Sequence, residues 1–399
     1  MNRHLQSKPS GYTTILMLLV ILILFLIGGG LLNLGLQGRL TAIRDTSQTM
    51  ARCAADAGLT KAIFEMNAKL KAKDWDDSVL PVATDEILQG CDATFSYAVS
   101  KDSNNVYSVQ SIGKTGQTVE TVGCILRLKS IFEHALLVAE TLNVKNNNLI
   151  SGYNSVTGET DLEVQIGTLG TASKSVILGS GIVTGNVIVG VGGDPETIID
   201  ADGTITGTKY AITEEYLLPQ ITAPVLPDMG TINVSGTTVI SPAKNGKYTA
   251  ITASTNGDIL EIDGGDVVLH ITGNIDMSNF SEIKIIDGST LTLYVDGNIT
   301  FTNGAGINNP SDHPADFKLY ATGEGPQTFE LKNNSDVFGV IYAPNADIIF
   351  KNNARLNGSI VSKSLTMMNN STFYYDEALR DASVDEEAAR FAIERWFEQ

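Results

Sequence analysis

The longest apolar stretch of the chain lies near its start. Between Ile15 and Leu36 no charged side chain interrupts the run. At a rise of 1.5 Å per residue, a helix of this length crosses a hydrocarbon layer of roughly 30 Å. A segment in lipid must satisfy its backbone hydrogen bonds internally, and a helix does so. The pattern therefore predicts a transmembrane helix at residues 12–40.

After this run the pattern becomes periodic. From Thr41 to about Lys73, apolar residues recur every three or four positions, as in an amphipathic helix. Both stretches are predicted to form one long helix whose second half lies on a small domain. Three consecutive glycines, Gly28, Gly29 and Gly30, are expected to loosen its apolar half, because each costs about 1 kcal/mol relative to alanine.

The next segment alternates between apolar and polar side chains, which is typical of strands with one buried face. Three runs are clear, at residues 94–99, 106–112 and 118–128. Together with the amphipathic helix they predict a small α+β segment at residues 41–130. Cys91 and Cys124 lie at the start and the end of this sheet. Outside the cytoplasm they are either a disulfide or two small buried residues.

From His134 onward, short apolar runs are separated by glycine and asparagine. Asparagine pairs at 333–334, 352–353 and 369–370 are spaced 19 and 17 residues apart. Asparagine suits corners because it tolerates left-handed backbone and its amide can bond to the next copy. A repeat near this length without helical periodicity favours a solenoid. The predicted fold class is mainly β, with a right-handed parallel β-helix at residues 131–379; a β-sandwich is the alternative.

Two segments interrupt that texture. Residues 214–230 hold three prolines and are predicted to be an excursion from the β-helix or a strap along its side. Residues 380–399 are acidic and show helical periodicity, so they predict a C-terminal amphipathic helix. That helix is expected to cap the last strands, because an open end exposes backbone hydrogen-bonding groups.

Charge constrains partners and orientation. The formal net charge of −18 argues against nucleic acid as a partner of the body. The segment before the apolar run carries Arg3 and Lys8 and no acidic residue. Positive charge on a short flank predicts a cytoplasmic leader at residues 1–11, a single pass through a bacterial inner membrane, and a body in the periplasm or outside the cell. A cleaved secretory signal is the alternative, disfavoured by the length of the apolar run.

A short basic leader, Ser10-Gly11 before the apolar run, and ARCAADAGLTKAIFEM at Ala51–Met66 form a recognisable combination. With it, residues 8–130 resemble the N-terminal region of PilX-type minor pilin and pilus-assembly proteins. Two later stretches, GVIYAPNADI and LNGSIVSKSL, resemble the β-helical domain that commonly follows such N-termini.

The resemblance implies that the long helix is a membrane anchor before assembly and a filament core afterwards. It implies a leader cut between Gly11 and Tyr12, although type IV pilins usually carry glutamate where this chain has Leu16. The residues expected in the membrane or filament core are Ile15, Leu16, Leu19, Ile23, Phe25, Gly28, Gly29 and Gly30. Those expected between the helix and its head domain are Ala51, Ala54, Ala55, Gly58 and Leu59.

Few residues of the predicted β-helix suit catalysis. Arg355 is the single arginine between Ile131 and Leu379, and no nucleophile elbow, phosphate loop or zinc spacing is present. His270 follows the strand alternation and is predicted to point outward or to be satisfied within its strand. The sequence thus predicts neither enzymatic activity nor a cofactor. Calcium is the one weak candidate, through alternating acids before a glycine: Asp194, Glu196, Asp200 and Asp202.

These patterns predict a structural protein. One helix anchors it, other pilin-like subunits or the pilus assembly machinery are its partners, and its body is a surface for adhesion to a surface or a glycan. A membrane-tethered protein that binds or cleaves polysaccharide is the alternative. A scaffold that polymerises through residues 134–399 is a third possibility.

Overall fold

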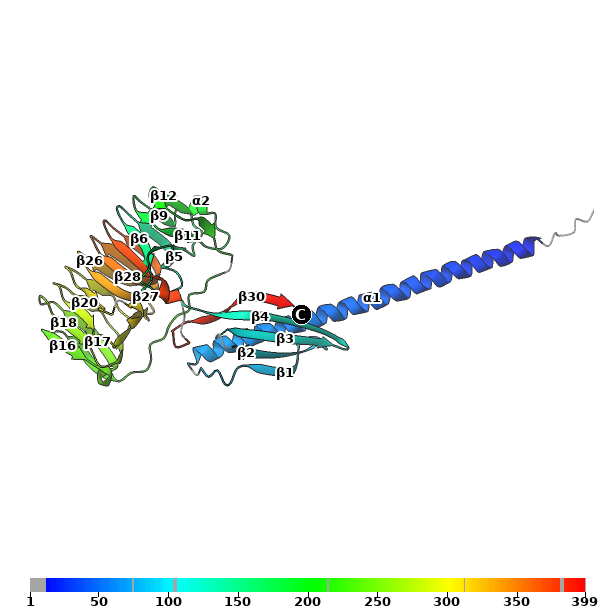
Figure 1. The fold of residues 1–399 in the computed structure, drawn as a ribbon, viewed down its shortest axis with the longest axis horizontal. Coiled ribbons are helices and arrows are strands. Elements are labelled where there is room, and N and C mark those ends of the chain that lie inside the picture. Colours follow the sequence, from blue (N-terminus) through cyan, green and yellow to red (C-terminus); the bar gives the residue numbers. More distant parts are fainter. Residues whose placement is uncertain are drawn as a thin grey trace, which may run out of the picture. The chain divides into compact units, whose positions relative to one another are not determined.

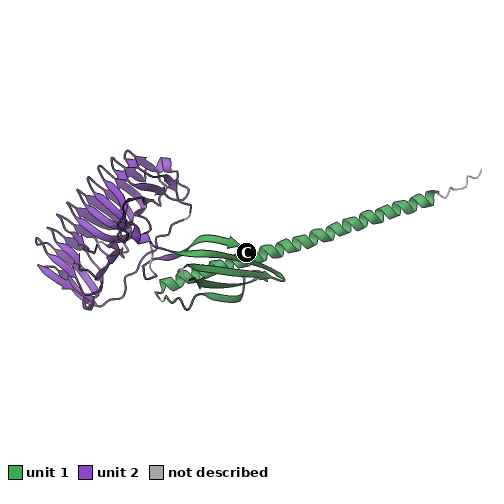
Figure 2. Cartoon of the chain, in the orientation of Figure 1, with its two compact units in different colours: residues 1–127, 391–399 green, residues 128–390 purple. Residues whose placement is uncertain are grey.

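The computed structural model describes residues 12–398 except for Asp74, residues 103–105, Glu214, Asp312 and residues 381–383. The predicted leader at 1–11, including Gly11, lies outside the described residues. The chain divides into two compact units (Figure 2). Unit 1 combines Met1–Arg127 with Phe391–Gln399, and unit 2 is Leu128–Arg390. Unit 2 is therefore inserted, along the sequence, between two segments of unit 1.

Unit 1 is one helix and one sheet (Figure 1). Helix α1 (Tyr12–Lys71) runs without a break through all three consecutive glycines. The five strands lie in the order β1-β2-β3-β4-β30, and the pairings from β1 to β4 are antiparallel. Their bounds are β1 (Val82–Ile87), β2 (Thr94–Lys101), β3 (Tyr107–Thr115), β4 (Thr118–Lys129) and β30 (Arg390–Glu398).

The predicted C-terminal helix is wrong, because Arg390–Glu398 form strand β30 at the edge of that sheet. Phe391 is 2% exposed, and its ring centroid lies 5.1 Å from that of Trp75 and 5.0 Å from that of Tyr107. The Asn67 amide donates to the Phe391 carbonyl at 3.1 Å and accepts from its N–H at 2.8 Å. These long-range contacts favour the strand over the helix that the local pattern suggests.

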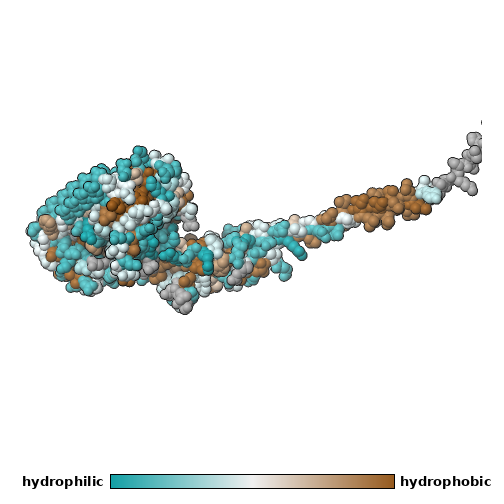
Figure 3. Space-filling view, turned by 45° about the horizontal axis from the view of Figure 1, so that its top comes forward, coloured by the Kyte–Doolittle hydropathy of each residue, from teal (hydrophilic) through white to brown (hydrophobic). Residues whose placement is uncertain are grey.

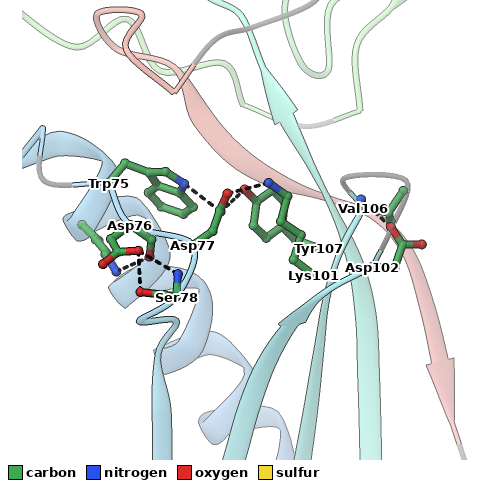
Figure 4. A network of polar contacts seen from close by, with 9 residues as sticks. Trp75, Asp76, Asp77, Ser78, Lys101, Asp102, Val106 and Tyr107 are labelled. Atoms are coloured by element: carbon green, nitrogen blue, oxygen red, sulfur yellow. Dashed lines mark hydrogen bonds and ion pairs between the residues drawn. The ribbon is translucent and has the colours of Figure 1, made fainter.

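A polar cluster follows the C-terminal end of α1 (Figure 4). The carboxylate of Asp77 accepts hydrogen bonds from Trp75 Nε1 at 3.0 Å, Lys101 Nζ at 2.6 Å and the Tyr107 hydroxyl at 2.6 Å. The bonds from Lys101 and Tyr107 are the main reason that the pKa of Asp77 lies below its usual value. This cluster ties the segment after the helix to β2 and β3.

Unit 2 holds a 25-stranded sheet, helix α2 (Pro195–Ile198) and three short 3₁₀ turns, η1 (Pro242–Lys244), η2 (Pro314–Asp316) and η3 (Glu377–Arg380). The strands before the proline-rich segment are β5 (Leu136–Val144), β6 (Leu149–Tyr153), β7 (Thr160–Leu162), β8 (Val164–Thr168), β9 (Val176–Leu178), β10 (Ile182–Val183), β11 (Gly185–Val189), β12 (Ile199–Ala201), β13 (Thr204–Ile205) and β14 (Lys209–Ala211).

The strands after it are β15 (Asp228–Asn233), β16 (Thr237–Ile240), β17 (Gly246–Ala253), β18 (Ile259–Ile262), β19 (Asp266–Ile271), β20 (Ile275–Met277), β21 (Glu282–Ile285), β22 (Thr290–Val295), β23 (Ile299–Phe301), β24 (Gly306–Asn308), β25 (Phe317–Ala321), β26 (Gln327–Lys332), β27 (Asp336–Lys351), β28 (Arg355–Met367) and β29 (Thr372–Asp376). Alternate side chains of these strands are buried, and aliphatic and phenylalanine side chains form one continuous core.

The predicted right-handed parallel β-helix is wrong. Eight strands pair in parallel to form a closed circuit, as in a parallel barrel, and the other strands lie outside this circuit. The strands of the circuit, in order of pairing, are β17, β19, β22, β25, β27, β26, β23 and β20, and β20 pairs again with β17. It closes because β17 and β27 each pair with one strand through their first half and with another through their second half.

The neighbours also depart from chain order. β5, the first strand of unit 2, pairs with β28 near its end, and β6 pairs with β29. The strands of residues 136–211 and those of residues 228–376 therefore form the two halves of the sheet, which meet where β5 and β6 pair with β28 and β29. A β-helix read in chain order does not contain this arrangement.

Asparagines occupy corners between the strands, as the sequence predicts. Asn279, Asn303, Asn333 and Asn352 have φ between 52° and 57°, the left-handed region. The side chain of each of the last three donates to the preceding asparagine, at 3.4, 3.3 and 3.1 Å in turn. These contacts form a ladder along one edge of the stack.

The proline-rich segment lies against unit 2. The Tyr342 hydroxyl donates to the Pro219 carbonyl at 2.6 Å, and Ile221 is 6% exposed. Tyr342 is the last of three tyrosines at equivalent register positions of β22, β25 and β27, the others being Tyr294 and Tyr320. The segment is thus a strap over a tyrosine column.

His134 should make unit 2 less stable in mild acid. Its side chain is 11% exposed, its Nδ1 has no hydrogen-bond partner, and burial lowers its pKa from 6.5 to about 4. The folded state therefore favours the neutral ring, whereas the unfolded chain takes up a proton near pH 6.5. The stabilisation that the neutral His134 ring gives to the folded state is complete above pH 6.5. As the pH is lowered to 4, the free energy of unfolding falls by about 3 kcal/mol.

Urea unfolding of unit 2, followed by circular dichroism between pH 7.5 and 4, measures this loss. In His134→Leu the fall over that range should shrink by about 3 kcal/mol. An unchanged pH profile in the variant would assign the acid sensitivity to other groups.

Candidate membrane and assembly surface

The first half of α1 is exposed rather than packed on the sheet of unit 1. Every residue from Tyr12 to Leu40 is exposed, and Figure 3 shows the apolar part of this stretch as a hydrophobic surface. Among the described residues it supplies the one helix long and apolar enough to cross a membrane or to serve as a signal segment. The five large apolar residues singled out from the sequence are 44% to 79% exposed: Ile15, Leu16, Leu19, Ile23 and Phe25.

Gly28, Gly29 and Gly30 lie inside this exposed surface. A Cβ placed on any of them would meet no neighbouring atom within 4 Å. The helix continues through all three positions. The loosening expected from the sequence is thus not visible as a change of secondary structure. Because they carry no side chains, these glycines leave room for another helix to approach closely.

The second half of α1 packs on the sheet through small side chains. Its buried residues include Ala51, Ala54, Ala55, Gly58 and Leu59, the five expected between helix and head domain. Small residues at these positions let the helix backbone approach the strands. The approach is closest at Gly113 of β3, where an added Cβ would lie 1.9 Å from the Ala51 carbonyl oxygen.

The pairing of Cys91 with Cys124 is not formed, since both are free thiols. Cys124 is fully buried between the sheet and α1, and burial raises the pKa of its thiol to about 11. Cys91 is half-buried and directs its Sγ at the Leu88 carbonyl. Cys124 therefore fills the core as a small apolar residue, while Cys53 on α1 is exposed.

The calcium candidates do not form one site. Asp194 caps α2, and its carboxylate accepts from the Glu196 N–H at 3.1 Å. Asp200 is paired with Lys174 at 2.8 Å. Asp202 lies in the turn between β12 and β13. Across the described parts of the chain, no three His, Cys, Asp or Glu side chains are grouped so that they could hold a metal ion.

His270 belongs to a small polar cluster beside the strap. Its Nε2 lies 2.9 Å from Asp296, and the same carboxylate accepts a hydrogen bond from the Thr322 hydroxyl at 2.6 Å. The three residues line a cavity of about 680 Å³. A catalytic triad requires the imidazole between the hydroxyl and the carboxylate. Here the carboxylate is central, so the hydroxyl has no base to activate it.

Sequence reasoning missed the residues that pack α1 on the sheet and those that hold the C-terminal strand at its edge. Asn67 lies on the helix and shows no pattern that marks it, and Gly113 is one of 38 glycines. For Phe391, the run RFAI holds three consecutive apolar residues and does not alternate, so it gave no clear signal for a strand.

Residues 221–382 match the family model of a domain of unknown function, DUF7305, which is less than half of the chain. No relative is found among curated proteins.

Three solved structures show likenesses to this chain. The competence-associated pilin ComZ from Thermus thermophilus is 12% identical, with 89% of this chain and 98% of that chain covered and a TM-score of 0.28. The ice-binding protein of the Antarctic ascomycete Antarctomyces psychrotrophicus is 13% identical, with 61% and 94% covered and a TM-score of 0.31. The DUF3494 domain of a Shewanella frigidimarina ice-binding protein is 12% identical, with 62% and 95% covered and a TM-score of 0.30. Such TM-scores do not indicate a shared fold, so the function proposed below rests on this chain's own residues.

Proposed function

We propose that this protein is a pilin-like subunit of a type IV pilus-type assembly. In this proposal the first half of α1 anchors it in the bacterial inner membrane and later lies among the helices of other subunits. The observation that carries the proposal is the division of α1. One half is apolar and fully exposed, and the other half is buried on the sheet of unit 1.

The exposed half requires an apolar environment. Fully burying one large aliphatic or aromatic side chain is worth about 1.5–3 kcal/mol, and at least a dozen such side chains are exposed before Leu40. Lipid or the apolar helices of other subunits would supply that burial. Either environment fits a helix whose apolar residues face all directions.

The position of unit 2 in the sequence supports a display role. Its chain leaves unit 1 after β4 and returns as β30 of the same sheet. A large insertion at this point leaves the helix and its packing residues unchanged. We propose a structural role without a catalytic step, because the contacts of His270, Asp296 and Thr322 do not activate a nucleophile.

The membrane part of the proposal is tested by Leu19→Lys combined with Ile23→Lys. Each lysine at the centre of a membrane helix costs about 2.5–3.5 kcal/mol, so the pair should weaken partitioning by more than a thousandfold. The wild-type chain should remain with membranes through an alkaline carbonate wash, and the double variant should be released. The control is Thr41→Lys with Thr46→Lys, two exposed positions that only bond back to their own helix.

Release of the wild-type chain by carbonate, or retention of the double-lysine variant, would contradict the proposed anchor. The filament part has its own readout, the presence of the chain in pili sheared from cells. If the chain stays in membranes but is absent from sheared pili, the result supports the membrane anchor and contradicts the filament role.

A further inference from the structure

Arg355 occupies an unusual place in unit 2. It is the single arginine between Leu128 and Leu379, in a chain of net charge −18. Its guanidinium carbon lies 5.3 Å from the ring centroid of Tyr374 and 5.9 Å from that of Phe338. Among the described residues no carboxylate lies within 4.0 Å of it, and its Nε donates a hydrogen bond to Asn357 Oδ1 at 3.2 Å. Most of its donors are therefore not committed to another side chain.

The surrounding residues form one row across four neighbouring strands. Phe338 of β27, Asn357 of β28, Tyr374 of β29 and Ser151 of β6 are consecutive register partners. Asn357 is only 4% exposed, although the neighbouring Leu356 points into the core. A row on the outer face of a sheet is buried in this way only when another segment covers it.

The hairpin of β6 and β7 lies beside this row, because its residues line one cavity together with Phe338, Asn357 and Tyr374. These two strands pair antiparallel, unlike the parallel pairings around them. Hydrogen bonds hold the start of the connecting turn: the Asn154 side chain accepts from two turn N–H groups at 2.9 Å, and the Ser155 N–H donates to Asp376 at 3.0 Å. The hairpin and the row enclose a cavity of about 430 Å³, within the range of small-molecule sites.

The polar groups of this cavity indicate its ligand. Arg355 can only donate hydrogen bonds, whereas Glu159 and Asp161, on the hairpin side, can only accept when ionised. Ser151 also lines the cavity, and its hydroxyl is buried without a partner. A simple anion would meet the two carboxylates, and a simple cation would meet the guanidinium. A hydroxyl group both donates and accepts hydrogen bonds, so a polyol can bond to the donor side of the cavity and to its acceptor side.

We propose that this cavity binds a neutral saccharide residue, such as the terminal hexose or N-acetylhexosamine of a glycan. Its ring would contact Tyr374 and Phe338, while its hydroxyls bond to Arg355 and Asn357 on one side and to the acids on the other. The site is one pocket and not a groove, which agrees with the low aromatic content of 7%. This inference does not depend on the membrane anchor or on filament assembly.

The test is a titration of the full chain in phosphocholine nanodiscs, which carry no sugar headgroup. Galactose, glucose, mannose and N-acetylglucosamine are the neutral probes, and galacturonate is the acidic one, each followed by saturation-transfer NMR. At least one neutral probe should bind with a dissociation constant on the order of 1 mM, as expected for a ligand of this size. Galacturonate should bind more weakly than galactose, because Glu159 and Asp161 repel it.

Two variants locate the binding site. Arg355→Gln and Tyr374→Leu should each weaken binding at least about tenfold. Lys284→Gln removes one positive charge from another strand of unit 2 and should leave binding unchanged. The proposal is overturned if no neutral sugar binds at tens of millimolar, if galacturonate binds more tightly than galactose, or if binding survives in both pocket variants with unchanged circular dichroism.

Discussion

Replacing Gly113 by alanine is expected to prevent stable packing of α1 on its sheet. The new Cβ would lie 1.9 Å from the Ala51 carbonyl oxygen and 2.5 Å from the Ala55 nitrogen. Both atoms belong to the helix backbone, so no side-chain rotation relieves the clash. Overpacking that side chains can absorb costs about 1–3 kcal/mol, and a clash with backbone should cost more than about 3 kcal/mol.

Tryptophan fluorescence measures this effect directly, because the two tryptophans of the chain, Trp75 and Trp396, both lie in unit 1. Urea titration of Gly113→Ala should show a midpoint far below that of the wild type. Gly325→Ala is the matched control, since nothing lies within 4 Å of its Cβ position. A wild-type midpoint for Gly113→Ala would contradict the close approach of helix and strand.

Gly58→Ala, on the helix side of the same contact, should cost less. Its Cβ would meet the Ser111 hydroxyl at 2.4 Å and the Phe95 ring at 2.9 Å, which are side-chain atoms. Alanine also gains about 1 kcal/mol of helix propensity over glycine. The two substitutions therefore separate backbone clash from side-chain clash at one interface.

The second large effect is expected at Phe391. Truncation to alanine removes a ring that is 2% exposed and contacts Trp75 and Tyr107. Substitutions of this kind cost about 3–5 kcal/mol. Because β30 is held at the sheet edge by this ring and by the Asn67 amide, Phe391→Ala should release the strand and expose it to proteases.

Trp396→Ala is the control on the same strand. Its side chain is 56% exposed, so the change should stay within about 0.5 kcal/mol. Equal losses for both variants would show that the buried ring of Phe391 does not hold the strand more than the exposed Trp396 does. Equal wild-type stability for both would contradict the anchoring role of Phe391.

Local pattern predicted the long helix and three of the five strands of unit 1. The periodic stretch ending at about Lys73 corresponds to α1, which ends at Lys71. The three alternating runs correspond to β2, β3 and β4. These elements are specified by side chains close in sequence, through the periods of the helix and the strand.

Contacts between distant segments were not predictable in this way. One partner of β5 is β28, more than 200 residues later, and no local signal distinguishes that strand from the other short apolar strands of unit 2. RFAIERWFE has both a helical and an alternating component, and the open edge of β4 selects the strand. The cavity at Arg355 depends on register across four strands, so the sequence marked the arginine only by its rarity.

The proposed function depends on where the two halves of α1 lie in the cell. A water-soluble maleimide tests this with the native thiol Cys53, which is exposed in the packed half, and with Phe25→Cys in the apolar half. Cys91 and Cys124 are replaced by serine and alanine in both variants, and Cys53 is also replaced by serine in the Phe25→Cys variant, so that each variant reports one position. In membranes whose body-facing side is accessible to the reagent, Cys53 should be labelled. The thiol at position 25 should react only after detergent is added. Equal labelling of both positions before detergent would contradict a membrane-anchored or filament-buried helix.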